Sequence, residues 1–280
     1  MVLRRAPRSG GGSGWGRLIV AGIIVIVSLI SYFGAQVYNP VTDENQHINI
    51  TVEQEVALGL QAAPEMAAQY GGLSNDRQAE ALVSRVGEAI VAESAAGQAP
   101  YDYEFYLLDD PETINAFALP GGPIFITEGL LSRLETKGQL AGVLAHEITH
   151  VVGRHSAEQI AKANLTEGLT GAAVIAAYDP NDPSTQGTAQ VALLIGQLVN
   201  LKFGRDDELE ADRLGVRWMS DAGYDPRSMS AVMEILAGAA GPNRQPEFFA
   251  THPDPGNRLA NIETAIEAEF PNGVPQGMTP

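Results

Sequence analysis

The sequence predicts an α+β protein that is mainly helical, with a small sheet and one membrane-spanning helix near its N-terminus. An uncharged apolar run at 18–38 predicts the membrane helix. Only two runs, 103–108 and 123–127, have the aromatic and aliphatic composition of strands. Most of the chain after residue 128 carries helix-spaced apolar residues. Few strands placed irregularly among helices argue against a doubly wound parallel sheet.

Composition and charge exclude several classes of protein. The 280 residues include 34 acidic and 17 basic side chains, a net charge of −17, and no cysteine. Such an acidic chain lacks the basic surface that neutralises phosphates, so nucleic-acid binding is excluded. The absence of cysteine excludes disulfide scaffolds, thiolate zinc sites, iron–sulfur clusters and cysteine nucleophiles.

The N-terminal region predicts a cytoplasmic tail followed by a membrane anchor at 18–38. Residues 1–17 are rich in glycine and serine and contain four arginines, whereas no charged residue lies between Arg17 and Asp43. About 20 apolar residues span a bilayer, and basic residues in front of such a helix place the N-terminus in the cytoplasm. The alternative is a cleaved signal peptide and a soluble protein. Cleavage after Ala35 would put Phe33 at the −3 position, which requires a small residue.

The remaining sequence predicts one folded domain between a linker and a short tail. Residues 39–50 have the polar composition of a linker, 51–270 carry the helix and strand patterns, and 271–280 form a C-terminal tail. The turn Pro120-Gly121-Gly122 leads into the second strand. Helix-spaced apolar residues predict helices at 51–70, 76–93, 128–134, 138–154, near 156–177, near 188–203, 206–221, 226–239 and 255–269.

Two further apolar stretches, 168–177 and 189–201, predict core helices of this domain. They have about 10 and 13 residues, which is too short to cross a bilayer as helices. The polar segment 178–187 between them is rich in Pro, Asp, Asn and Ser, and suits either a lid or an ordinary connection.

His146-Glu147-Ile148-Thr149-His150 is the motif that predicts chemistry. Thr136 and Gln139 form a capping-box pattern that starts a helix just before it. At about 100° per residue, the two histidines lie about 40° apart, opposite the apolar residues of the same helix. Two neutral imidazoles at this spacing reach one Zn²⁺, and the glutamate is placed to take a proton from water.

A catalytic zinc takes a third protein ligand, for which the sequence offers two candidates. His155 follows the motif by five residues and points away from its first histidine on a continuing helix, which favours a structural or supporting role. Glu208 is the better candidate, because Asp212 lies one turn further on the same helix face, where it is placed to accept an imidazole N–H. Glu210 points about 200° away from Glu208 and is expected to be a solvated surface charge.

Four motifs together carry a family resemblance. They are 115–122 (NAFALPGG) followed by 124–126, 146–155 (HEITHVVGRH), 205–212 (RDDELEAD) and 251–255 (THPDP). In this combination they resemble the HtpX/BepA family of zinc metallopeptidases, to which the CAAX prenyl endopeptidases also belong. The resemblance covers roughly residues 50–270 and is to the small bacterial members that face the periplasm.

The resemblance implies a zincin-like (gluzincin) metalloprotease domain behind one membrane helix. It implies one Zn²⁺ per chain, bound by His146, His150 and Glu208, with Glu147 as general base. It also implies a single-pass protein of a bacterial inner membrane whose catalytic domain lies in the periplasm, or, if the N-terminal helix is cleaved, a soluble periplasmic protein.

The same resemblance implies roles for three further residues. Asp212 orients a ligand, and Arg205 supports the ligand set from outside it. His252 has an active-site role, either as a ligand of the zinc in a resting state or as a group that steadies the oxyanion. From the sequence alone, a His-Pro pair between Pro246 and Pro255 predicts only a rigid turn.

The predicted reaction is the hydrolysis of peptide bonds in unfolded or misassembled extracytoplasmic proteins, as protein quality control. An extended substrate is expected to pair with the second strand, whose backbone reads no side chains. The residues of that strand are Gly122, Pro123, Ile124, Phe125 and Ile126. The alternative is a latent, zinc-bound chaperone or assembly factor for envelope proteins, against which the intact Glu147 speaks. Prenyl-protein processing is disfavoured, because no multi-span chamber for a lipid is predicted.

Overall fold

A computed structural model describes residues 13–177, 203–240, 245–253 and 256–280. These residues form two compact units. One unit holds the chain up to Gln36 together with helix α6 (His155–Ala177) from Ile160 onward, and the other holds Val37–Gln159 and the described residues from 203 to the C-terminus. Outside the described residues lie 1–12 of the predicted tail, the segments 178–187 and 189–201, and nearly all of the helix predicted near 188–203.

The first unit contains the predicted membrane helix. α1 (Ser13–Gly34) has 22 residues, and its window Trp15–Gly34 has a mean hydropathy of 2.2 with 6% of its residues buried. By length and composition, α1 is able to cross a bilayer. The helix starts five residues before the predicted range 18–38 and ends four residues before the end of that range. It ends early because a strand begins at Gln36.

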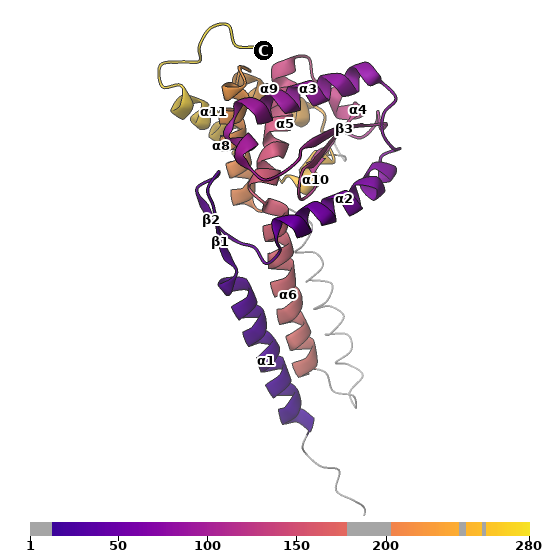
Figure 1. Cartoon of the computed structure of the whole chain (residues 1–280), viewed down its shortest axis with the longest axis vertical. Coiled ribbons are helices and arrows are strands. Elements are labelled where there is room, and N and C mark those ends of the chain that lie inside the picture. The colour runs from indigo at the N-terminus through magenta and orange to yellow at the C-terminus, as the bar shows by residue number, and fades with distance from the viewer. Residues whose placement is uncertain (1–12, 178–202, 241–244, 254–255) are drawn as a thin grey trace, which may run out of the picture. The chain divides into compact units, whose positions relative to one another are not determined.

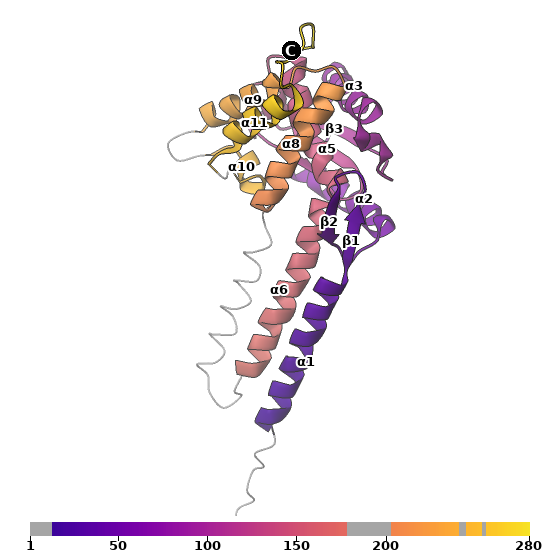
Figure 2. The same ribbon diagram turned by 90° about the vertical axis from the view of Figure 1, so that its left-hand side faces the viewer.

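Helix α6 lies beside α1 in both views, and the two helices run in opposite directions (Figure 1, Figure 2). The prediction of a core helix at 168–177 is wrong, because this stretch is the end of α6 and belongs to the unit of α1. None of the described residues of α6 belongs to the hydrophobic core of the other unit. Length and apolar composition alone do not distinguish a core helix from one that packs on another apolar helix.

The predicted linker 39–50 is partly a β-hairpin. β1 (Gln36–Asn39) pairs with β2 (Glu44–His47) in a two-stranded sheet. The buried side-chain amides of Asn39 and Gln46 donate to the backbone carbonyls of Val152 and Gly153. The polar residues that suggest a linker therefore attach a hairpin to the end of a central helix.

The second unit is mainly helical, as predicted, and is built around α5 (Lys137–Val152). α5 is buried from Gly138 to Val152 and starts at the predicted capping box of Thr136 and Gln139. The other described helices of this unit are α2 (Val52–Gln69), α3 (Arg77–Glu93), α4 (Glu128–Leu131), α8 (Arg205–Asp221), α9 (Arg227–Gly238), α10 (Phe248–Thr251) and α11 (Arg258–Glu269), with a 3₁₀ turn at Ala95–Gln98. Of these, α3, α8 and α9 pack on α5.

Three strands form the small sheet, in the order β3–β5–β4. β3 (Glu104–Leu108) is parallel to β5 (Pro123–Thr127), and β4 (Ala116–Ala118) is antiparallel to it. The predicted substrate strand is therefore the central strand, and both of its edges are already paired. The prediction chose the wrong strand because β4, with only three residues, gives no strand signal of its own. In the described part of the chain β4 is an edge strand, and it contacts α5 and α10.

Helix α8 approaches α5 closely at Gly215. A Cβ atom at this position would lie 3.3 Å from the backbone nitrogen of His146, so a side chain here would push the two helices apart. The two turns of α8 that precede Gly215 contain Glu208 and Asp212. Close packing of the helices therefore brings both carboxylates to the histidines of α5.

Replacement of Gly59 in α2 is expected to destabilise the second unit. A Cβ atom at Gly59 would lie 1.9 Å from the carbonyl oxygen of Pro120, so the backbone has to shift. Gly59→Ala should lower the free energy of unfolding by about 1–3 kcal/mol, although alanine favours helix. Gly238→Ala is the control, because nothing lies within 4 Å of a Cβ atom there. Thermal unfolding compares the two variants, and equal midpoints would contradict the close contact.

Candidate metal centre

α5 presents two imidazoles to the interior of the domain. His146 and His150 are 3% and 1% exposed, and their Nε2 atoms are 3.1 Å apart. Glu147 is fully buried, and neither of its carboxylate oxygens has a hydrogen-bond partner among the described residues. The structure therefore places His146, Glu147 and His150 in one buried site.

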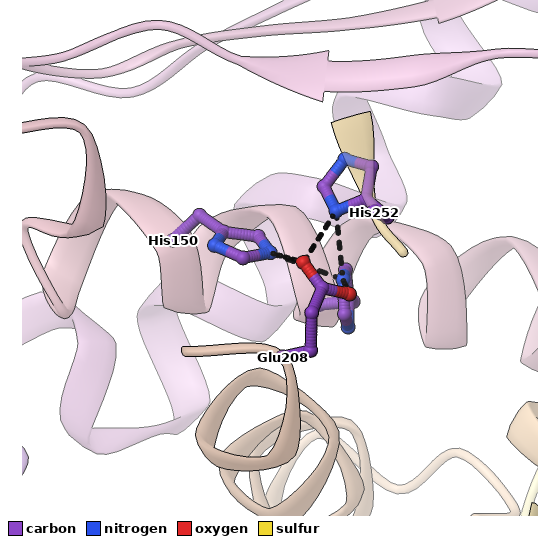
Figure 3. A group of neighbouring side chains, drawn as sticks. His150, Glu208 and His252 are labelled. Atoms are coloured by element: carbon purple, nitrogen blue, oxygen red, sulfur yellow. Dashed lines mark hydrogen bonds and ion pairs between the residues drawn. The ribbon is translucent and has the colours of Figure 1, made fainter. Parts of the chain in front are cut away.

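Glu208 and His252 reach the same site from two other helices. Oε1 and Oε2 of Glu208 lie 3.5 Å from Nε2 of His150 and of His146, respectively. Nδ1 of His252, at the end of α10, lies 3.0 Å from Oε1 of Glu208. Figure 3 shows the carboxylate of Glu208 directed at the rings of His150 and His252. One possible ligand atom from each of the four side chains lies within 4.8 Å of the others, which fits a single metal ion.

The charges of the site also fit a divalent cation. Glu147, Glu208 and Asp212 bring three buried carboxylates together, and Arg258 supplies one buried guanidinium. With neutral imidazoles, three negative charges and one positive charge leave a net charge of −2. Such a buried excess is costly unless a cation compensates it. Imidazole nitrogen with carboxylate oxygen is a ligand set that Zn²⁺ accepts.

Burial and hydrogen bonds shift the pKa values of the cluster in opposite directions. Burial and the charge of Arg258 lower the pKa of His146, but hydrogen bonds to carboxylates, first that of Asp212, outweigh them and raise it to about 9. Burial lowers the pKa of His150 well below its usual value, and the charge on His146 lowers it further. Burial raises the pKa of Glu147. The two imidazoles of the motif therefore differ, because at neutral pH only His146 carries a second proton and with it a positive charge.

Asp212 fixes the orientation of His146. Its Oδ1 accepts the Nδ1–H of His146 at 3.0 Å, which leaves Nε2 directed at Glu208. Arg258, at the start of α11, donates to both oxygens of Asp212 at 2.6 and 2.8 Å. The sequence analysis missed Arg258. Its signal was weak: a single arginine shortly after the 251–255 motif, at the start of a predicted helix.

Arg205 does not support the ligands, contrary to the prediction. Its side chain is exposed at the start of α8 and donates to Asn257 at 3.2 Å. Arg205 and Arg258 are each the first residue of their helix, so the position in the helix does not decide their burial. The buried guanidinium of the site comes from Arg258.

A second chain of hydrogen bonds holds His150. Its Nδ1 is 2.8 Å from Nδ1 of His155, and Nε2 of His155 is 3.0 Å from Oε2 of Glu210. With Nε2 of His150 turned to the ligand group, its Nδ1–H donates to His155, which in turn donates its Nε2–H to Glu210. His155 therefore has the expected supporting position. The prediction that Glu210 is a solvated charge is wrong, because the start of α6 covers that side of α8.

Two phenylalanines that the sequence analysis did not single out pack on the imidazoles. The ring of Phe248 stacks on His252 with a centroid distance of 4.4 Å, and Phe203 stacks on His150 at 4.1 Å. The backbone N–H of Phe248 also donates to the carbonyl of Ile114, which precedes β4. This bond ties the segment that carries His252 to the edge of the sheet.

The chain matches known proteins over most of its length. Residues 77–266 match peptidase family M48. The mitochondrial metalloendopeptidase OMA1 of Schizosaccharomyces pombe is 33% identical over 247 residues, which are 87% of this chain and 70% of the relative. The beta-barrel assembly-enhancing protease of Escherichia coli K12 is 31% identical over 223 residues, 76% of this chain and 44% of the relative. This chain therefore spans less than half of the Escherichia coli protein.

Metal binding is expected to displace the proton of His146. With a pKa of about 9, this imidazole is protonated at pH 7, and a metal ion competes with the proton. The apparent affinity for Zn²⁺ should therefore rise about tenfold per pH unit between about pH 7 and pH 9, with about one proton released per ion at pH 7. Chelator competition and proton release in dilute buffer measure both quantities. An affinity that stays constant over this range would contradict a protonated His146.

Loss of His155 is expected to weaken metal binding. Removal of a hydrogen-bond partner of a ligating histidine costs about 10–100-fold in metal affinity, so His155→Ala should lose about that much. Glu210→Gln keeps an acceptor for the imidazole N–H and should lose less. Asp206→Asn changes an exposed residue of the same α8 and serves as the control. Competition with a chromophoric chelator measures each Kd, and an unchanged Kd in His155→Ala would exclude the supporting role.

Proposed function

The chain belongs to peptidase family M48, and on this basis we propose that it is a membrane-anchored zinc metalloendopeptidase that cleaves unfolded or misassembled extracytoplasmic proteins. The resemblance predicted from the four motifs is confirmed, and a metalloendopeptidase activity follows from the family and the relatives. Zinc as the metal, the roles of single residues, the topology and the substrate are what the proposal adds.

The observation that carries the proposal is the position of Glu147 beside four converging ligand atoms. Its carboxylate is buried and lacks hydrogen-bond partners among the described residues, so its lone pairs remain open to a water or a substrate. Burial raises its pKa, which suits a group that takes up and returns a proton. A metal site with a purely structural role does not need such a neighbour.

The residues of the site then divide the work of peptide hydrolysis. A zinc ion held by His146, His150 and Glu208 supplies Lewis acidity to water and to a peptide carbonyl. Glu147 takes the proton of the attacking water and returns it to the leaving amine. Asp212 keeps the first imidazole in the tautomer that presents Nε2 to the metal.

His252 has two proposed roles, and its position favours the resting state. Its Nδ1 lies among the ligand atoms, where a catalytic zinc keeps a position open, and its Nε2 is 3.5 Å from Oε1 of Glu147. In this position the imidazole closes the site, so it has to move before a peptide carbonyl enters. Once displaced, the same ring is available as a donor to the oxyanion.

We propose that the substrate pairs with the outer edge of β4, and not with β5 as the sequence predicts. Asn115, Phe117 and Leu119 pair with β5, so the backbone groups of Ala116 and Ala118 point to the opposite side. A peptide that adds to this edge is held by main-chain hydrogen bonds, which depend on an extended chain more than on its sequence. Such binding favours unfolded polypeptides as substrates.

α1 is the proposed anchor in a bacterial inner membrane. The arginines before it favour a cytoplasmic N-terminus, which puts the M48 domain in the periplasm. The alternative is a cleaved helix and a soluble periplasmic enzyme.

A chaperone or assembly factor with a latent zinc site is the second candidate function. The observation in its favour is that a ligand atom of His252 lies within 4.8 Å of those of His146, His150 and Glu208. Bound to the metal from there, His252 would take the position that a catalytic zinc needs for water. The two candidates differ in whether any state of the protein cleaves peptide bonds.

Glu147→Gln is expected to abolish proteolysis without loss of metal. The amide has nearly the same size but takes no proton, so kcat for casein cleavage by the full chain in detergent should fall about 10²–10⁴-fold. Metal content should stay at one ion per chain. Glu53→Gln, an exposed residue of α2, is the matched control. Undiminished cleavage by Glu147→Gln would reject the mechanism.

His252→Ala separates the two candidate functions in the same assay. Removal of a blocking imidazole should raise the rate of cleavage, whereas loss of an oxyanion donor should lower it. Zinc-loaded wild type and His252→Ala that both leave casein intact, yet suppress its aggregation, would favour the chaperone.

A further inference from the structure

Helix α6 extends from the metal centre into the unit of α1. It begins at His155, and its residues from Ile160 onward lie along α1 in antiparallel orientation (Figure 1, Figure 2). The two helices touch at Gly168, where a Cβ atom would lie 2.1 Å from Oγ of Ser28. A larger residue there would require the Ser28 side chain to turn away or the helices to shift, so residues 28 and 168 face each other at close range.

This register sets the depth of α6 in a bilayer that α1 spans. Ser28 lies six residues inside Gly34, the outer end of the apolar window, which is about 9 Å along the helix. Gly168 is therefore at about the same depth. From there α6 continues for nine residues to Ala177, about 13 Å further, towards the N-terminal end of α1. The end of α6 thus passes the middle of a hydrocarbon core that is about 30 Å thick.

The side chains of α6 from Leu165 onward suit this depth. The hydroxyls of Thr166 and Thr170 donate to backbone carbonyls one turn earlier in the same helix, so neither needs water. Glu167 is the one ionisable side chain from Leu165 to Ala177. It lies between the bilayer midplane and the outer surface. At that depth the free-energy cost of burying one carboxyl group is smaller than the gain from transferring the aliphatic side chains of this stretch out of water.

The outer faces of α1 indicate what surrounds the pair. Ala21 is buried, whereas Ile19, Ile23, Ile26 and Ile30 are each more than half exposed. A helix with this pattern has one face for a partner helix and the rest for lipid. On α6, Ala173 is exposed, and the larger apolar side chains of Leu165, Leu169 and Ile175 are half-buried.

We propose that Leu165–Ala177 of α6 is embedded in the bilayer beside α1. The protein then holds the membrane by two helices, one of which starts at the histidine that supports His150. The inference rests on the proposed function of α1 as an anchor. It differs from a single-pass topology, in which all residues after α1 lie outside the membrane.

Single cysteines test the proposal cleanly, because the chain has none of its own. Spin labels are attached to Ala173→Cys on α6, Ile26→Cys on α1 and Ala57→Cys on α2, all at exposed positions, in the full chain in phospholipid vesicles. Oxygen concentrates in lipid and a nickel chelate stays in water. The label on α6 is expected to be accessible to oxygen and protected from nickel, as on α1, whereas the label on α2 shows the reverse.

Each other result has a defined meaning. A label at position 173 that nickel reaches as readily as at 57 overturns the proposal, and so does a label protected from both reagents, because protein then covers it. If nickel also reaches position 26, the anchor itself fails, and with it the membrane part of the proposed function.

The register is tested separately with cysteine pairs. Ser28→Cys with Gly168→Cys is expected to form a disulfide on mild oxidation, since the two Cβ positions are adjacent. Ser28→Cys with Gly171→Cys is the control, because nothing lies within 4 Å of a Cβ atom at Gly171. Equal cross-linking of both pairs, or none of the first, overturns the depth assigned to α6.

Discussion

The metal centre depends on one constraint, the burial of an excess of negative charge beside two imidazoles. Glu147, Glu208 and Asp212 have almost no exposed surface, and Arg258 neutralises only one of their charges. A proton on His146 offsets one of the two remaining charges, which is why the pKa of this imidazole is raised, and a divalent ion would offset both. The same charges that raise the free-energy cost of burying the site therefore favour the binding of a cation.

Helix α8 supplies three acidic side chains that contact the two imidazoles directly or through His155. Glu208 turns to both imidazoles of α5, Asp212 supports the first through its Nδ1, and Glu210 supports the second through His155. Each imidazole thus has one nitrogen for the metal and one fixed by the protein. The supporting carboxylate contacts the ring of His146 directly and that of His150 through His155.

The sequence predicts what is local and misses what depends on packing between distant segments. The spacing of the 146–150 motif and the pair Glu208 and Asp212 follow from helix geometry, and the structure brings all of them together. The environment of Glu210 depends on where α6 starts. The periodicity of α8 alone does not predict this. The buried Arg258 and the exposed Arg205 look alike in the sequence, because burial is decided by the tertiary contacts of α11 and α8. Strand β4 is too short for a periodic signal. The sequence therefore predicts substrate pairing with β5, which is the central strand of the sheet.

The edge of the sheet and the state of the metal site are linked through one backbone contact. The carbonyl of Ile114, which precedes β4, accepts the N–H of Phe248. Phe248 stacks on His252, the imidazole that closes the ligand group. If a peptide pairs with this edge, as the proposed function has it, and reaches as far as Ile114, it would compete for the carbonyl that accepts the N–H of Phe248.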